Sequence, residues 1–121
     1  MNGWERTRIN EAMIRLAHGD RDAFGVVFDG LWPHVRAFMD RAAPGHPDRE
    51  DLAQRTLLNV FERISDFDVT RDGVAWAFGI AAYEVKTLRR QMQRRREAPI
   101  DAARGRADDA GASPEEQVIR T

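Results

Sequence analysis

Residues 48–97 read DREDLAQRTLLNVFERISDFDVTRDGVAWAFGIAAYEVKTLRRQMQRRRE, two helical patterns joined by a short polar loop. In the first, from about Asp48 to Ser65, apolar residues recur at about the 3.6-residue spacing of an amphipathic helix. The second, from about Val74 to Arg96, carries a similar stripe and ends in a run of basic residues. The first helix opens with acidic residues instead. This contrast suggests a domain with two different macromolecular partners.

The chain before this region predicts two more helices. One runs from about Trp4 to His18 and is expected to end at Gly19. Asp20 can cap the next helix, whose long apolar stripe contains Pro33. Because proline removes a backbone donor, we expect a bend near Leu31 within a single helix. The apolar positions of this stripe are Phe24, Val27, Phe28, Leu31, Val35, Phe38 and Met39.

Helix-breaking residues at Ala43–Pro47 separate the second helix from the third. Asp48 then stands as an N-cap, with Asp51 three residues on as a weaker relative of the capping box. No segment has the alternating pattern of a strand, so we predict an all-α fold. Residues 1–97 are expected to form a compact bundle of about four helices with a kinked second helix. Residues 98–121 predict a flexible linker that leads into the start of a truncated further segment at Ser113–Glu116.

Charge is distributed unevenly along a chain whose formal net charge is only −1. Residues 75–97 hold six basic and two acidic side chains, whereas acidic residues outnumber basic ones on either side. Nucleic-acid binding requires only a local basic stripe, so the near-neutral total does not exclude it. No apolar run reaches the ~18 residues of a membrane span, and no signal-peptide core is present. We therefore expect a cytoplasmic protein without membrane contact.

The sequence contains no pattern typical of an enzyme, a metal site or a cofactor site. Cysteine is absent, which excludes disulfides and thiolate chemistry. His18, His34 and His46 lack the spacing of zinc ligands, and the glycines form no phosphate-binding loop. The acids at the start of the third helix more often stabilise the helix dipole than gather a cation. We predict a non-enzymatic protein with no cofactor and no metal.

The last helix combines basic and aromatic side chains in a pattern that suits nucleic acid. Trp76 and Tyr83 lie off the apolar stripe on a common face, and aromatic rings beside arginines can stack on unpaired bases. Packing of Trp76 on the second helix is the alternative. A basic row on one face of the helix can follow a phosphate backbone, although a solvated helix end has the same composition. The residues of this row are Lys86, Arg89, Arg90 and Arg94.

The ordered motifs DREDLAQ, LL, ISDFD, AWAFGIAAYEV and LRR resemble region 2 of an extracytoplasmic-function (ECF) sigma factor. Such a factor is the promoter-recognition subunit of bacterial RNA polymerase. The likeness extends to the earlier run LAHGDRDAFGVVFDGLWPHVRAF and spans about residues 9–97. Each motif alone is weak, but their order and spacing make the combination specific. The resemblance implies a helical domain that acts in transcription initiation.

The resemblance also implies two sets of site residues. The helix at 48–65 would dock on the clamp coiled coil of the β′ subunit of core RNA polymerase through Glu50, Asp51, Gln54, Arg55 and Asn59. The loop at 66–75 would capture a flipped base of the promoter −10 element, and the last helix would hold the non-template strand. The implied DNA-binding residues are Phe67, Asp68, Thr70, Arg71, Trp76, Tyr83, Lys86, Arg89, Arg90 and Arg94. An anti-sigma factor would be a further partner of such a protein.

The chain departs from the family pattern at several points. Tyr83 stands where an asparagine commonly reads DNA, and Arg55 stands where an acid is frequent. The second DNA-binding domain, region 4, is absent, so we expect an excised domain or a one-domain variant. These departures keep open a sigma-like module that binds a regulatory protein, with little sequence-specific DNA binding. A generic nucleic-acid-binding bundle is a third interpretation and would bind duplex as readily as single strand.

Overall fold

A computed structural model describes residues 1–97, which form four α-helices and two short 3₁₀ turns, with no strand among them. The all-α fold and the number of helices agree with the prediction. The linker and truncated segment predicted at 98–121 lie outside the described residues. The helices are α1 (Gly3–Ala17), α2 (Phe24–Ala42), α3 (Arg49–Arg63) and α4 (Gly73–Glu97), and the 3₁₀ turns are Arg21–Ala23 and Ile64–Asp66.

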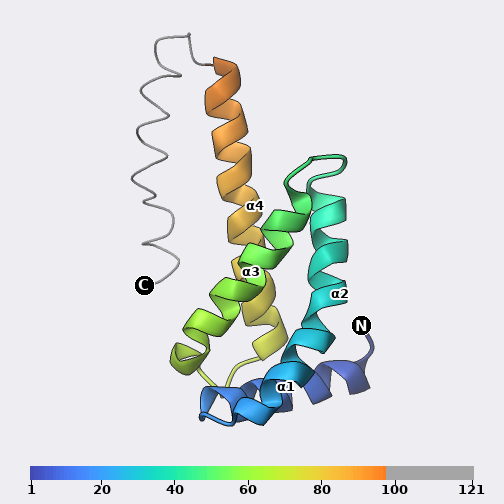
Figure 1. Cartoon of the computed structure of the whole chain (residues 1–121), viewed down its shortest axis with the longest axis vertical. Helices are drawn as coiled ribbons and strands as arrows, with labels where there is room; N and C mark the ends of the chain where they lie inside the picture. Colours follow the sequence, from blue (N-terminus) through green and yellow to red (C-terminus); the bar gives the residue numbers. More distant parts are fainter. Residues whose placement is uncertain (98–121) are drawn as a thin grey trace.

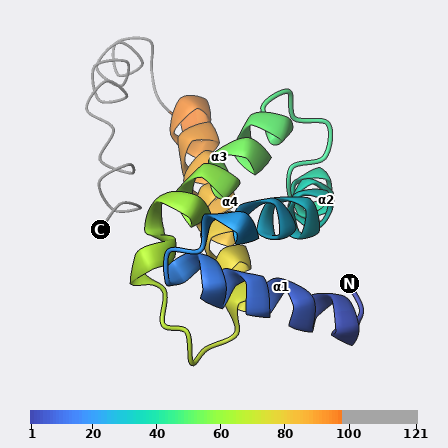
Figure 2. The same ribbon diagram turned by 60° about the horizontal axis from the view of Figure 1, so that its bottom comes forward.

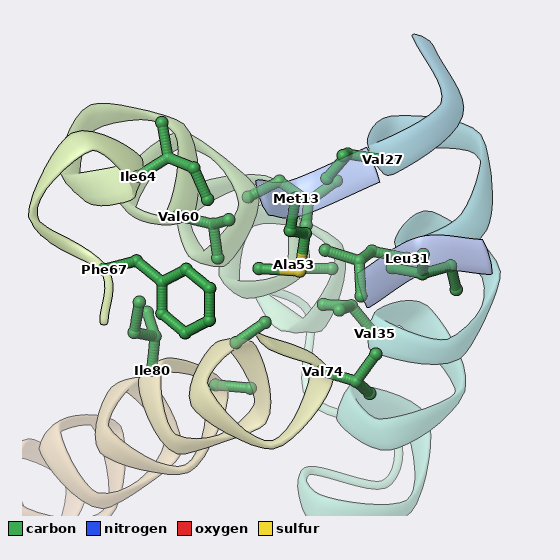
Figure 3. Close-up of a cluster of buried hydrophobic side chains, with 14 of the residues drawn as sticks. Met13, Val27, Leu31, Val35, Ala53, Val60, Ile64, Phe67, Val74 and Ile80 are labelled. Atoms are coloured by element: carbon green, nitrogen blue, oxygen red, sulfur yellow. The ribbon is translucent and has the colours of Figure 1, made fainter. Parts of the chain in front are cut away.

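Helices α2, α3 and α4 pack against one another, and α1 crosses their base (Figures 1 and 2). The C-terminal half of α4 rises beyond the bundle (Figure 1). Apolar side chains from all four helices meet in one core, shown in part in Figure 3. Among them are Ile9, Met13, Val27, Leu31, Val35, Met39, Leu57, Val60, Val74 and Ile80.

Gly19 ends α1 as the sequence predicts. Its φ of +96° lies in the left-handed region that favours glycine. The N–H of Gly19 donates to the carbonyl of Leu16 at 2.9 Å, and the N–H of Asp20 donates to that of Arg15 at 3.0 Å. The prediction that Asp20 caps the second helix was wrong, because its side chain accepts from the N–H of Asp22 and caps the preceding 3₁₀ turn.

Two further local predictions have different outcomes. α2 runs unbroken through Pro33, so the prediction of one helix is confirmed, and the bend near Leu31 stays a prediction. Asp48 occupies the N-cap position of α3, but its side chain makes no capping hydrogen bond. Its backbone N–H instead donates to Nδ1 of His46 at 3.0 Å, which ties the loop to the helix start. The capping role expected of the Asp48 side chain was therefore wrong.

The apolar stripe of α2 is wider than the part of it that is buried. Val27, Leu31 and Val35 follow one another at four-residue steps and are fully buried. Phe24 and Phe28 lie on the flank of this row and remain 47% and 36% exposed. Because α3 covers the stripe only in part, two phenylalanine rings that the sequence grouped with core positions stay at the surface.

Candidate protein and nucleic-acid surfaces

The outer face of α3 carries three of the residues predicted to contact a polymerase. Glu50, Asp51 and Gln54 are exposed, whereas the buried residues of α3 lie on its other side. Glu50 pairs with Arg36 of α2 across 3.8 Å, and the same guanidinium lies 5.7 Å above the ring of Trp32. This face therefore borders the aromatic side chains of α2.

An open apolar groove of about 410 Å³ runs between α2 and α3. The ring centroids of Phe24 and Phe61 lie 4.3 Å apart, and those of Phe28 and Trp32 lie 5.8 Å apart. Leu58 on its edge is 63% exposed. Contiguous exposed apolar surface of this kind is typical of binding sites. We call this the aromatic groove, and its lining residues are Phe24, Phe28, Trp32, Gln54, Leu57, Leu58 and Phe61.

Sequence reasoning did not identify the aromatic groove. Gln54 was assigned to the polymerase face together with Glu50, Asp51, Arg55 and Asn59, without any apolar neighbour. The available signal was the unusual width of the apolar stripe on α2, which is broader than one neighbouring helix can cover.

Arg55 and Asn59, also assigned to the polymerase face, turn toward α4. Nδ2 of Asn59 donates to Oε2 of Glu84 at 2.9 Å, and a guanidinium nitrogen of Arg55 lies 3.5 Å from Oε1 of the same carboxylate. Asn59 is only 7% exposed, so the expectation that it lies on the polymerase surface was wrong. Its position on α3 points it into the helix interface. Glu84, which the sequence analysis did not single out, is the shared partner.

The loop after α3 is organised around Asp68. Its Oδ1 accepts from the N–H and the hydroxyl of Thr70 at 3.0 and 2.7 Å, and its Oδ2 lies 3.5 Å from Arg71. The hydrogen bond from the Thr70 side chain is the main reason that the pKa of Asp68 is below its usual value. All three side chains are exposed, as a nucleic-acid-binding loop requires.

Phe67 does not share this exposure. It is 6% exposed, and Figure 3 shows it in the core beside Val60 and Ile80. Its ring centroid lies 4.9 Å from that of Trp76. The ring fills the space beneath the loop instead of facing solvent, and a contact of Phe67 with DNA stays a prediction. Trp76 is half-buried against this ring, and its packing on α2 stays a prediction.

Helix α1 holds the start of α4 and the end of the same loop. Asp72 caps α4 through the N–H groups of Val74 and Ala75. Nε of Arg6 donates to Asp72 at 2.8 Å, and this interaction holds the pKa of the Asp72 carboxyl below its usual value. Oδ1 of Asn10 accepts from the N–H of Val74 at 2.9 Å. The contacts of Arg6 and Asn10 with the start of α4 join residues more than sixty positions apart, and no local sequence pattern indicates them.

The basic row of α4 is exposed along its length, with Tyr83 half-buried at its start. Lys86, Arg90 and Arg94 follow one another at steps of four along the C-terminal half of α4. Arg89 differs, because its guanidinium donates to the carbonyl of Ala42, the last residue of α2, at 3.1 Å. It therefore satisfies a carbonyl at a helix end that has no intrahelical partner.

Two negative observations apply to residues 1–97 alone. In this part of the chain, no group of three or more histidine, cysteine or acidic side chains is arranged to hold a metal ion. None of the described helices is both long enough and apolar enough to cross a membrane.

Comparison with known proteins provides one informative match. The chain is 35% identical over 106 residues to the ECF RNA polymerase sigma factor SigF of Caulobacter vibrioides (strain NA1000 / CB15N). The match covers 86% of this chain and 59% of the relative, so the chain spans less than two thirds of that protein's length. No protein-family model matched the chain, and no solved structure matched it significantly. Over most of its own length the chain is therefore similar to an ECF sigma factor.

Proposed function

We propose that this chain is a transcription initiation module that joins core RNA polymerase to promoter DNA in the cytoplasm. The observation that carries the proposal is the pair of distinct exposed surfaces on one small bundle, the aromatic groove beside Gln54 and the basic row of α4. Apolar surface with a polar rim is typical of protein interfaces, and a row of cations is typical of phosphate binding. The similarity to an ECF sigma factor supports polymerase and promoter DNA as the two partners.

The polymerase surface consists of the outer face of α3 and the aromatic groove. A helix of the β′ clamp coiled coil places apolar side chains in the groove, while Asp51 and Gln54 form polar contacts at its rim. The rings of the groove already pack on one another, so little side-chain freedom is lost on binding. An anti-sigma factor that covers the same groove competes with polymerase.

The DNA surface consists of the loop around Asp68 and the basic row. The exposed Thr70 and Arg71 meet a flipped base of the −10 element, and Trp76 supports it from the side. Tyr83 stacks on a neighbouring base of the non-template strand. Phe67 holds the loop and Trp76 from below without touching DNA. Lys86, Arg89, Arg90 and Arg94 follow the backbone.

Binding to both partners tests the proposal. Fluorescence anisotropy would follow a labelled non-template −10 oligonucleotide and its duplex at several salt concentrations, with and without purified core polymerase. We expect a preference for the single strand and a steep loss of affinity with salt. Equal binding of single strand and duplex would contradict the proposal and favour a generic nucleic-acid-binding bundle.

A matched pair of variants tests the polymerase surface. Leu58→Ser removes an exposed apolar side chain from the groove, and Trp4→Ser removes one from α1, outside the groove. We expect Leu58→Ser to weaken polymerase binding about tenfold, or ~1.4 kcal/mol, which is a significant interface contact below the hot-spot range, and Trp4→Ser to leave binding unchanged. Equal effects of the two variants would remove the groove from the interface.

The rival function is a module that binds a regulatory protein and has little sequence-specific DNA binding. The aromatic groove favours it as well, and so does Arg89, whose guanidinium already contacts α2. This function predicts groove-dependent protein binding without preference for any −10 sequence. Selection from a randomised single-stranded pool separates the two, because an enriched motif supports the promoter-binding function alone.

A further inference from the structure

A carboxylate is buried between α3 and α4 near the middle of α4. Glu84 is 2% exposed. A buried charge is costly unless it is paired and hydrogen-bonded. Both Asn59 and Arg55 of α3 reach this carboxylate, one oxygen each. The interface between the two helices therefore contains a three-residue polar cluster, Arg55–Glu84–Asn59.

The position of this cluster along α4 is informative. Glu84 and Val85 form the last fully buried turn, and no residue from Lys86 to Glu97 is fully buried. Beyond this turn α4 is held by the half-buried Leu88 and by the hydrogen bond from Arg89 to the carbonyl of Ala42, so the turn at Glu84 is the last fully buried anchor before the basic row. The basic row begins directly after it, and Tyr83 precedes Glu84 by one residue.

The buried stripe of α4 around Glu84 mixes short and larger side chains. Ala77 and Ala81 make few interlocking contacts, whereas Ile80 and Val85 pack in the core beside them. A buried polar contact is directional, and such contacts fix helix register in well-studied coiled coils. The hydrogen bond from Asn59 and the ion pair with Arg55 supply that direction here.

We propose that Arg55 and Asn59 are positioning residues for DNA binding, which act through Glu84 to orient Tyr83 and the basic row of α4. The inference rests on the proposed function, and it assigns Arg55 to the support of the DNA surface rather than to the polymerase surface that the sequence resemblance implied. Although more than half exposed, Arg55 has its guanidinium directed at Glu84.

The test measures two affinities for the full chain and its variants, one for the single-stranded −10 oligonucleotide and one for core polymerase. Arg55→Gln is expected to lower oligonucleotide affinity on the order of fivefold, the lower end of coupling between sites, and to leave polymerase affinity unchanged. Arg8→Gln removes the same charge from an exposed position on α1 and controls for net charge. Arg55→Lys keeps a cation near Glu84 and should retain most of the affinity.

A double-mutant cycle with Glu84→Gln separates an indirect role from a direct contact. This variant keeps an oxygen that can accept from Asn59 but removes the charge. If Arg55 acts through Glu84, then Arg55→Gln has no further effect on oligonucleotide affinity in the Glu84→Gln background. Additive effects would show a direct contact of Arg55 with DNA and would overturn the inference.

Other outcomes are equally decisive. A loss of polymerase affinity in Arg55→Gln without a loss of oligonucleotide affinity would return Arg55 to the polymerase surface and overturn the inference. If Glu84→Gln does not fold, equal affinities of Arg55→Lys and Arg55→Gln for the oligonucleotide would overturn it instead. If the unaltered chain binds neither the oligonucleotide nor polymerase, the proposed function itself is refuted. If the unaltered chain binds both partners but the effects of Arg55→Gln and Glu84→Gln are additive, only this inference is refuted.

Discussion

Replacing Gly73 by alanine is expected to destabilise the protein, although alanine generally favours helices. A Cβ at position 73 would lie 2.8 Å from Sδ of Met13 and 3.2 Å from Oδ1 of Asn10. Met13 is fully buried, so its side chain has no solvent to move into. Asn10 is held by its hydrogen bond to the N–H of Val74. At least one of these two side chains must shift to make room.

The magnitude follows from these contacts. Overpacking a core costs ~1–3 kcal/mol, and disrupting the Asn10–Val74 hydrogen bond adds ~1 kcal/mol. Gly73 is the first residue of α4, so little of the ~1 kcal/mol that separates alanine from glycine inside a helix is regained. We expect a loss of ~2–4 kcal/mol in the free energy of unfolding, where each kcal/mol lowers the melting temperature by ~4–8 °C.

Urea unfolding followed by far-ultraviolet circular dichroism measures this loss. Gly79→Ala is the matched control, since it lies on the same helix with no atom within 4 Å of the added Cβ. It should stabilise the protein by ~1 kcal/mol. Combining Gly73→Ala with Met13→Ala should cost less than the sum of the two single changes, because the smaller side chain makes room. If Gly73→Ala proves as stable as the unaltered protein, or if the two changes are additive, the steric argument is refuted.

Three further predictions test the acid dependence, the basic row and the core. The pKa of the Asp72 carboxyl is lowered in the folded protein, so its stabilising effect is complete above its unfolded pKa of ~3.9 and disappears as the pH falls through the folded value. Thermal melts at several pH values should therefore show a weaker acid dependence of the melting temperature in Asp72→Asn than in the unaltered protein. Identical acid dependence of the two proteins would contradict this. Arg90→Gln should reduce the salt slope of single-strand affinity by ~0.7 without changing the melting temperature. Arg89→Gln should reduce the slope in the same way and also lower the melting temperature, because it removes the hydrogen bond to Ala42. Equal melting temperatures of the two variants would count against a role of Arg89 at the end of α2. Met39→Ala, at a fully buried position, should cost ~2–5 kcal/mol in urea unfolding, and a loss below ~1 kcal/mol would show that Met39 is not a core residue.

Much of the fold is determined locally and could be predicted from the sequence. Apolar periodicity, the glycine at position 19 and the polar loops specify the helices, since these signals act within a few residues of the structure they produce. The basic run at the end of α4 is likewise visible in the sequence, and its exposure follows because lysine and arginine are costly to bury without a partner. Nothing beyond local spacing is needed for these features.

Only the tertiary structure decided which side of each helix is covered and by what. Periodicity defines an apolar face but not how much of it a neighbour covers, so Phe24 and Phe28 were grouped with core positions although they lie at the surface. Asn59 and Phe67 were expected at the surface and are buried, because their partners Glu84 and Trp76 come from a later helix. Their burial depends on how two separate helices cross, and the spacing along either helix alone does not contain that information.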